Sequence, residues 1–363
     1  MSTFPCDGGR VMVAMSGGVD SSVAAGLLQE QGYDCTGVTM KLFDSGDGAI
    51  PRERSCCSLE DVEDARSVAY RLGIGYHVFN FSESFQEEVI DRFIRAYENG
   101  MTPNPCIDCN RHLKFDRLYR RAAALGYDRI ATGHYVRIER DADSGRYLLK
   151  KARDAGKDQS YVLYAMTQEQ LAHTLFPLGG MTKAEVRAIA EARGFINARK
   201  RDSQDICFVQ GGCYADFIRE RTGKAYPEGD FIDTAGHVLG RHRGIIHYTV
   251  GQRRGLGLSF PEPMYVCAVD PADNTVTLGT ERELYTDTLT AEDVNLISCP
   301  ALDAPRRLRV RIRYRQPEQW AVVTQTGEDT LKIVFDRPQR AVTRGQAAVL
   351  YDGDTVVGGG TIR

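Results

Sequence analysis

The most constraining feature of this chain is the stretch SGGVDSS, residues 16–22. It follows an apolar run containing Val11 and Val13, typical of a buried strand, and precedes apolar residues at helical spacing. The chain therefore turns there from a strand into a helix. Gly17 and Gly18 let a ligand approach the backbone, and the N–H groups of the first helical turn point out of a positive helix end. The stretch predicts an anion-binding loop.

The kind of anion is narrowed by what the loop lacks. No G-K-[ST] follows the glycines at the Walker A spacing, so the lysine that reaches terminal phosphates in that loop is missing. The pattern favours a released pyrophosphate over a transferred phosphoryl group. Glycine-rich turns also occur for packing alone, but seven residues in this order are more specific. The loop resembles the PP-loop of the N-type ATP pyrophosphatases, which adenylate a carbonyl oxygen.

The first half of the chain alternates strand and helix signals. Strands are expected at 10–15, 35–40, 76–81 and 129–133, and helices near 21–31, 58–72, 84–98 and 111–125. Ser58, followed three residues later by Asp61, marks a helix start. Such alternation predicts an α/β, Rossmann-like parallel sheet with helices on both faces. Ligands bind beyond the carboxyl ends of such strands, where residues 16–20, Met40 and Gly133 fall.

From about residue 210 the pattern changes to short strands and turns, and after about 282 it becomes strand-rich and alternating. We expect three domains: a parallel-sheet adenine-nucleotide (PP-loop) domain over 1–208, a small mainly-β central domain over 209–281 and a C-terminal β-barrel over 282–363.

Composition sets broad limits. A chain of 363 residues with 42% hydrophobic and 26% charged residues suits a soluble globular protein of two or three domains. Neither end carries a spanning segment or a secretory signal, so we expect a cytoplasmic protein without a membrane partner. Ten cysteines in such a chain are not a disulfide framework. The net charge of -3 argues neither for nor against nucleic acid.

The segment RRLRVRIRYRQ at 306–316 alternates basic and apolar residues. As one strand it would place five cations on one face: Arg307, Arg309, Arg311, Arg313 and Arg315. Successive side chains on that face stand roughly 6.5 to 7 Å apart, close to the phosphate repeat of a single strand. RNA or DNA is the natural partner. The alternative is a solvated outer face compensated by acidic residues on neighbouring strands.

Three cysteines are candidates for chemistry. Cys106 and Cys109 are expected in a Pro-bounded loop just before a helix, and Cys207 lies in a second loop. Cys109 and Cys207 could be a nucleophile and a persulfide carrier, or all three could hold an iron–sulfur cluster with one open iron. A structural zinc site needs a fourth ligand, and His112 is the nearest, at weak spacing.

The motifs together resemble the bacterial tRNA-specific 2-thiouridylase family from residue 10 to the end of the chain. They are SGGVDSS, TPNPCIDCNRHLKF, ATGHY, KDQSYVLY, DICF, HYTVGQRRGLG and RYRQ. The resemblance implies that ATP adenylates the C2 oxygen of the wobble uridine, U34. A persulfide sulfur then displaces AMP to leave 2-thiouridine.

The resemblance also implies residue roles. The ATP site would comprise Ala14, Met15, Ser16, Gly17, Gly18, Val19, Asp20, Ser21, Met40 and Gly133, with Asp20 placing Mg²⁺. Contacts to tRNA would come from Asn104, Pro105 and Cys106 at the target base, from Lys157, Asp158 and Gln159 at the flipped nucleotide, and from Arg313 and Tyr314. The central domain and the barrel would also contact tRNA. Cys207 would carry the persulfide and Cys109 would attack or resolve it.

One departure separates this chain from well-known members, which have an aspartate where it has Cys106. A thiolate replaces a ligating carboxylate well, so the substitution favours a [4Fe-4S] cluster on Cys106, Cys109 and Cys207. The implied partners are the tRNAs for Lys, Glu and Gln and a persulfide donor, either a cysteine desulfurase or a sulfur-relay protein. The alternatives are a thiolase for cytidine 32 or uridine 8, and a PP-loop amide-forming ligase.

Overall fold

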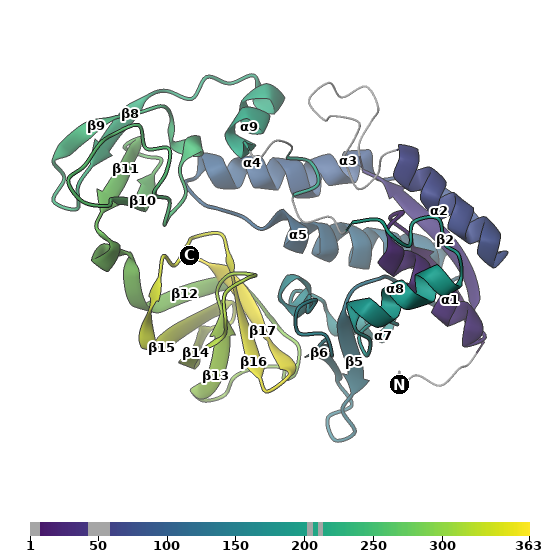
Figure 1. The fold of residues 1–363 in the computed structure, drawn as a ribbon. Helices are drawn as coiled ribbons and strands as arrows, with labels where there is room; N and C mark the ends of the chain where they lie inside the picture. The colour runs from purple at the N-terminus through teal and green to yellow at the C-terminus, as the bar shows by residue number, and fades with distance from the viewer. Residues whose placement is uncertain (1–7, 43–58, 202–205, 210–212) are drawn as a thin grey trace.

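The computed structural model describes residues 8–42, 59–201, 206–209 and 213–363 (Figure 1). Cys6, Cys56, Cys57 and the expected helix-start residue Ser58 lie outside the described residues.

The N-terminal part is built on a five-stranded parallel sheet, in the order β3-β2-β1-β4-β7. Its strands are β1 (Arg10–Ala14), β2 (Asp34–Lys41), β3 (Gly75–Asn80), β4 (Arg129–Ala131) and β7 (Thr174–Leu175). Four of them were predicted, and the parallel α/β sheet is confirmed. The short β7 was not expected.

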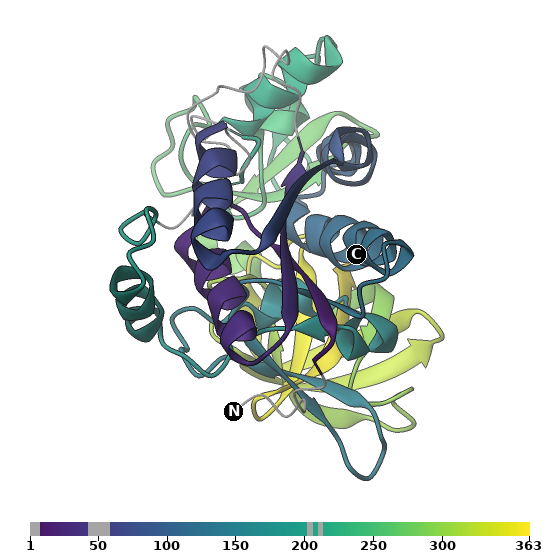
Figure 2. The same cartoon turned by 90° about the vertical axis from the view of Figure 1, so that its right-hand side faces the viewer.

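Helices cover both faces of this sheet, and β1 shows why. Val11 and Val13 face a cluster with α1 (Val19–Glu30), α2 (Leu59–Leu72) and α8 (Lys183–Ala192). Met12, between them, points to the opposite face, where residues 82–98 and 105–124 pack. Figure 2 shows these two helical layers on either side of the strands. Beside them, α7 spans Gln168–Ala172 and a 3-10 turn spans Ser160–Leu163.

The helices of the second layer contain wide turns. One runs through α3 (Ser82–Phe85), a π-helical segment (Gln86–Ile90) and α4 (Asp91–Glu98); the other runs through α5 (Pro105–Asp108), a π-helical segment (Cys109–Arg117) and α6 (Leu118–Ala124). The expected loop around the two cysteines is therefore wrong, since Cys106 and Cys109 lie within the helix. Asn104 caps it, its side chain accepting the Cys106 N–H at 3.2 Å, and Pro105 occupies the first helical position.

The middle of the chain forms α9 (Tyr214–Thr222) and a four-stranded sheet in the order β10-β11-β8-β9. The strands are β8 (Gly229–Ile232), β9 (Val238–His242), β10 (Tyr265–Asp270) and β11 (Thr275–Gly279), and 3-10 turns span Ile245–His247 and Glu281–Leu284.

The C-terminal part is a closed six-stranded antiparallel barrel, as expected, in which β12 pairs with β17 to complete the ring. Its strands are β12 (Tyr285–Leu296), β13 (Arg306–Arg311), β14 (Gln319–Gly327), β15 (Thr330–Arg340), β16 (Ala347–Asp352) and β17 (Thr355–Ile362). The boundaries 208/209 and 281/282 stay predictions.

An unexpected hairpin joins the N-terminal part of the fold to the barrel. β5 (Val136–Arg140) and β6 (Tyr147–Lys151) follow β4 in sequence, but β6 pairs with β17 and extends the barrel sheet to eight strands. The barrel is thus attached to the N-terminal part by strand pairing. No helix in the described part of the chain is long and apolar enough to cross a membrane.

Candidate active site

A cavity of about 690 Å³ opens at the carboxyl ends of β1, β2 and β4, where the sequence predicted a site. Thirteen of the predicted residues line it: Ala14, Met15, Ser16, Gly18, Val19, Asp20, Ser21, Met40, Gly133, Lys157, Asp158, Gln159 and Tyr314. The other predicted residues are not part of its lining: Gly17, Asn104, Pro105, Cys106, Cys109, Cys207 and Arg313. The cavity joins the loop to the segment expected to meet the uridine.

The loop at 16–22 is held by its own hydroxyl groups. Ser21 Oγ accepts the Ser16 N–H at 3.2 Å, and the hydroxyls of Ser21 and Ser22 both donate to the Gly18 carbonyl at 3.1 Å. Gly17 has a φ of 73°, and a Cβ there would lie 2.3 Å from the Asp61 carbonyl oxygen. Glycine is therefore required where the loop packs against α2.

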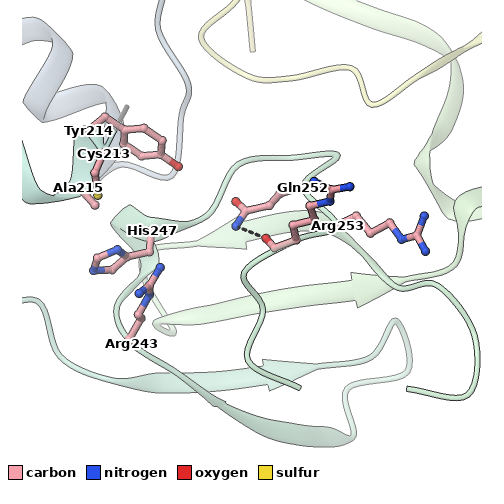
Figure 3. A pocket seen from close by; sticks show the side chains of 8 residues that line it. Cys213, Tyr214, Ala215, Arg243, His247, Gln252 and Arg253 are labelled. Carbon is pink, nitrogen blue, oxygen red and sulfur yellow. Dashed lines mark hydrogen bonds between the residues drawn. The ribbon is translucent and has the colours of Figure 1, made fainter. Parts of the chain in front are cut away.

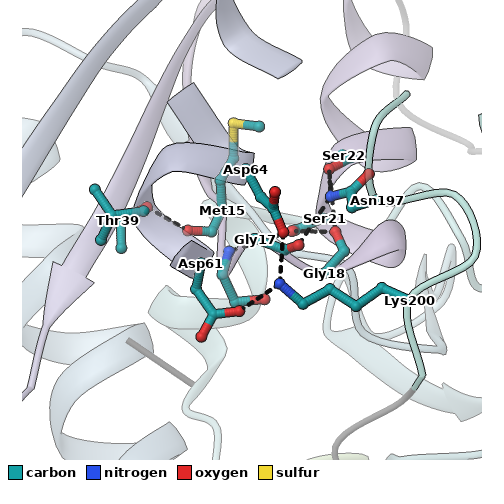
Figure 4. Close-up of polar contacts among 12 residues, drawn as sticks. Met15, Gly17, Gly18, Ser21, Ser22, Thr39, Asp61, Asp64, Asn197 and Lys200 are labelled. Atoms are coloured by element: carbon teal, nitrogen blue, oxygen red, sulfur yellow. Dashed lines mark hydrogen bonds and ion pairs between the residues drawn. The ribbon is translucent and has the colours of Figure 1, made fainter. Parts of the chain in front are cut away.

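A second set of contacts clamps the loop from residues 197–200 (Figure 4). Asn197 Nδ2 donates to the Gly17 carbonyl at 2.8 Å and to Ser22 Oγ at 2.9 Å. Lys200 Nζ lies 2.7 Å from Asp61 and 2.5 Å from Asp64 on α2. Asn197 therefore ties the loop to the segment after α8, and Lys200 ties that segment to α2.

Asp20, the expected Mg²⁺ ligand, is already neutralised. Its carboxylate accepts Lys183 Nζ at 2.7 and 2.8 Å and the Tyr135 hydroxyl at 2.7 Å. A carboxylate suits Mg²⁺, but both of its oxygens are engaged by a lysine that is only 12% exposed. Mg²⁺ at Asp20 would therefore compete with the Lys183 ammonium for the same two oxygens.

Sequence reasoning missed Lys183. The sequence offers only a local signal here, the capping box of Thr182 and Glu185. It places Lys183 at the first position of α8 but does not show what Lys183 contacts. Its approach to Asp20, 163 residues away, is a tertiary contact.

The segment that follows β4 closes the cavity against the loop. A Cβ on Gly133 would lie 2.7 Å from the Asp20 carbonyl carbon and the Ser21 nitrogen. Thr132 Oγ1 meets His134 Nδ1 at 2.7 Å, and burial lowers the pKa of His134 well below its usual value, so this histidine is neutral.

The wall expected to read the base is built by its own polar side chains. Asp158 accepts the backbone N–H groups of Ala152 and Ser160 and the Ser160 hydroxyl, at 3.1, 3.3 and 2.7 Å. Gln159 Oε1 accepts the Tyr135 N–H at 2.9 Å. These two side chains shape the wall rather than extend freely into the cavity.

Cys109 is buried and belongs to the main apolar cluster, and Cys207 is partly buried and packs against the same cluster. Cys106, one turn earlier, is exposed. Within the described residues, no group of three His, Cys, Asp or Glu side chains is placed to hold a metal ion. The three cysteines therefore do not form a ligand set in this structure, with or without His112.

The prediction of five arginines along one strand is wrong, because β13 ends at Arg311 and the next residues turn away. Arg313 donates to the Ala341 carbonyl at 2.7 Å and to Thr343 Oγ1 at 2.8 Å. Its contact with tRNA stays a prediction. Arg311 and Arg315 instead line the cavity with Tyr314.

The remaining two arginines lie on the outer face of the barrel. Arg307 pairs with Asp336 on β15. Arg307 and Arg309 also lie 5.4 and 5.0 Å from the centre of the Trp320 ring, which is 45% exposed.

A second pocket, of about 550 Å³, lies between the start of α9 and the segment 243–254 (Figure 3). It is lined by Cys213, Tyr214, Ala215, Arg243, His247, Gln252, Arg253 and Arg254.

Three domain models match the chain: a tRNA methyl transferase HUP domain over residues 9–211, a tRNA methyl transferase PRC-barrel domain over 215–280 and an aminomethyltransferase beta-barrel domain over 286–362. Curated relatives include the tRNA-specific 2-thiouridylases MnmA of Clostridioides difficile and Moorella thermoacetica. They are 53% and 54% identical over 353 and 351 residues, each covering 97% of this chain and 98% of the relative. A solved 4-thiouridine synthetase–RNA complex with bound ATP is 20% identical, with a TM-score of 0.37, and covers 55% of this chain and 44% of that one.

Proposed function

Because this chain belongs to the MnmA family of tRNA-specific 2-thiouridylases, we propose that it uses ATP to thiolate the wobble uridine, U34, of tRNA. The observation that carries the proposal is the shared cavity, which joins the anion-binding loop to the wall at residues 157–159 and Tyr314. One space can therefore hold a nucleotide and a base side by side.

In the first step the uridine C2 oxygen attacks the α-phosphorus of ATP, and the bond to the β-phosphate breaks. The loop at 14–21 holds the phosphates, and the helix end that follows it favours the pyrophosphate charge. Met40 and Gly133 border the adenosine. Asp20 is the expected Mg²⁺ ligand, and Lys183, which now contacts both of its oxygens, would shift toward the phosphates.

In the second step sulfur replaces AMP. The terminal sulfur of a persulfide on Cys207 attacks the activated C2 carbon, and AMP leaves with its bonding electrons. The Cys109 thiolate then attacks Cys207 Sγ, which leaves the sulfur on the base and a Cys109–Cys207 disulfide. The two cysteines supply the two electrons that reduce the transferred sulfur, and an external thiol restores them. A cysteine desulfurase or a sulfur-relay protein supplies the persulfide.

The substrate set is the tRNAs for Lys, Glu and Gln, with Asn104, Pro105 and Cys106 near the target base. The rival ligase chemistry transfers nitrogen and gives no role to two cysteines in one apolar cluster. A thiolase for another tRNA position would use the same loop, so position must be tested directly.

The test is a thiolation assay with purified protein, an unmodified tRNA transcript for Lys, ATP and a persulfide donor. We expect 2-thiouridine at position 34, with AMP and pyrophosphate formed in equal amounts. A transcript carrying cytidine at position 34 is the control and should stay unmodified. Sulfur found at position 8 or 32, or release of ADP, would reject the proposal.

A further inference from the structure

The cavity wall at residues 157–159 contains a buried negative charge. The Asp158 side chain is only 6% exposed, and its carboxylate accepts the N–H groups of Ala152 and Ser160. Those neutral donors do not cancel the charge. The cation comes from the barrel, because Nη1 of Arg311, on β13, lies 3.7 Å from Asp158 Oδ2. Among the residues that the structure describes, Arg311 is the one cation paired with this carboxylate.

A second group of the barrel reaches Asp158 through Ser160. The Ser160 hydroxyl donates to Asp158 Oδ2 at 2.7 Å and lies 3.2 Å from the hydroxyl of Tyr351, on β16. A serine hydroxyl has one proton, so Tyr351 is the donor in the second contact. Burial raises the pKa of Tyr351, so its hydroxyl keeps the proton that this contact needs. Two strands of the barrel therefore converge on one carboxylate of the wall.

Another ion pair crosses the same boundary with its charges reversed. Lys151 Nζ, on β6, lies 2.6 Å from Glu318 and 4.5 Å from the centre of the Tyr351 ring. Both charged side chains are mostly buried. Here the N-terminal part supplies the cation and the barrel supplies the carboxylate, the reverse of Asp158 and Arg311. Two crossed pairs favour a single placement of the barrel against the wall.

We infer that Arg311 is a positioning residue for the reaction in the cavity, which acts by neutralising Asp158 and holding the wall at 157–159 opposite the anion-binding loop. The inference rests on the proposed function for the reaction that this wall serves. It concerns the shape of the wall and not affinity for tRNA. Without Arg311, the buried carboxylate would lack a cation, and the wall would shift to bring it to water. A small displacement of reacting groups lowers a rate steeply.

The first experiment measures pyrophosphate release by the full chain at saturating ATP and saturating unmodified tRNA transcript for Lys. For Arg311→Gln we expect kcat to fall about tenfold or more, while the Kd for tRNA changes by less than about threefold. Arg311→Lys keeps the charge and should recover most of the rate. Weaker tRNA binding with an unchanged kcat would make Arg311 an RNA contact and overturn the inference.

Asp158→Asn separates positioning from direct contact with a substrate. If Arg311 acts through Asp158, adding Asp158→Asn to Arg311→Gln removes the unpaired charge and should raise the rate above that of Arg311→Gln alone. Absence of this rescue would reject the inference. The matched control is Arg137→Gln, which breaks another ion pair between the N-terminal part and the barrel, that of Arg137 with Asp354 at 2.6 Å, outside the cavity lining. It should leave kcat unchanged, and a thermal unfolding curve for each variant excludes loss of fold.

A second measurement does not depend on turnover. Hydrogen exchange followed by mass spectrometry reports on the N–H groups of Ala152 and Ser160, which Asp158 accepts. In Arg311→Gln these groups should exchange roughly tenfold faster, and Arg137→Gln should match the wild type. Unchanged exchange in Arg311→Gln would contradict the inference. A wild type that forms no 2-thiouridine at position 34 would reject the proposed function, and the exchange result would still decide the role of Arg311.

Discussion

At the scale of single residues, the best-defined contact in the cavity is the pair of Asp20 and Lys183. The lysine neutralises a carboxylate that lies among the groups expected to receive a triphosphate. When ATP enters, the lysine can exchange that carboxylate for phosphate oxygens and leave Asp20 free for Mg²⁺. Lys183 would then supply the cation that the loop lacks relative to a Walker A sequence.

We predict that Lys183→Met lowers the rate of pyrophosphate release by about tenfold or more, the effect of about 1.4 kcal/mol at the transition state. Lys150→Met is the matched control, since Lys150 is also mostly buried and pairs with Glu139 in the hairpin and with Asp354 between β16 and β17, outside the cavity lining. It should change thermal stability but not pyrophosphate release. Equal rates in the two variants would remove Lys183 from the mechanism.

The cysteines give a second prediction. Cys109→Ser and Cys207→Ser should abolish thiolation and retain tRNA binding, whereas Cys106→Ser should stay active because its thiol has no step in the persulfide route. Cys267→Ser, in the central sheet, is the control: burial raises the pKa of that thiol to about 11, so it is unreactive. Product is measured by mass spectrometry of digested tRNA. An inactive Cys106→Ser with bound iron in the wild type would favour the cluster instead.

A third prediction concerns Asp108, beside Cys109. Burial is the main cause that raises its pKa to about 6. The charges of Arg92 and Arg111 lower the pKa, and those of Asp293 and Glu88 raise it. Between about pH 4 and 6 the folded protein holds a proton that the unfolded chain has lost, so stability falls as pH rises through this window. Asp108→Asn should therefore raise the melting temperature more at pH 7.5 than at pH 4.5. An equal shift at both values would contradict this assignment.

At the scale of elements, the sequence predicted what local pattern determines and missed what distant segments determine. The loop at 16–22 and its flanking strand and helix were predicted because spacing and glycine chemistry are local. At 104–108, Asn and Pro are typical of a turn, but the same pair also starts helices, and here it starts α5. The alternation of basic and apolar residues continues past Arg311, but it does not reveal where the strand stops pairing.

The hairpin at 136–151 was missed for a different reason. Its partner strand, β17, lies about 200 residues later in the chain, and no short-range signal reports such a pairing. The contact of Lys183 with Asp20 was missed in the same way.

The junction between the loop and β4 yields a fourth prediction. Gly133→Ala would place a methyl group 2.7 Å from backbone atoms of Asp20 and Ser21, and overpacking of this kind costs about 1 to 3 kcal/mol. We expect the loop to shift and ATP binding to weaken. Gly180→Ala, with no atom within 4 Å of the added carbon, is the control and should bind ATP normally. Calorimetric titration with a non-hydrolysable ATP analogue measures both, and equal affinities would show that the loop adapts.

At the scale of the whole molecule, strand pairing and charged contacts connect the N-terminal part of the fold to the barrel. β6 pairs with β17, and Arg137 on β5 contacts Asp354 at 2.6 Å. Arg111, on the helix that carries Cys106 and Cys109, forms a two-point contact with Asp293 on β12. The barrel is therefore part of the framework that holds the helix carrying Cys109.

We predict that the N-terminal part and the barrel unfold together. Leu331→Ala, which removes a fully buried barrel side chain, should cost about 2 to 5 kcal/mol. Circular dichroism follows the helices, and a second probe follows the barrel. The variant should lower the melting temperature measured by both probes by the same amount. Thr326→Ala, at the far end of β14, is the control and should change neither. A barrel that melts first, with the helices intact, would contradict the shared framework.

The chain supplies that barrel probe itself. It contains one tryptophan, Trp320, half exposed on the outer barrel face beside two guanidinium groups. Fluorescence excited where indole absorbs and tyrosine does not therefore comes from this one position, although the protein has 17 tyrosines elsewhere. The fluorescence of Trp320 therefore follows the barrel without an added label. Any partner that displaces Arg307 or Arg309 from the ring would change the wavelength and the intensity of this fluorescence.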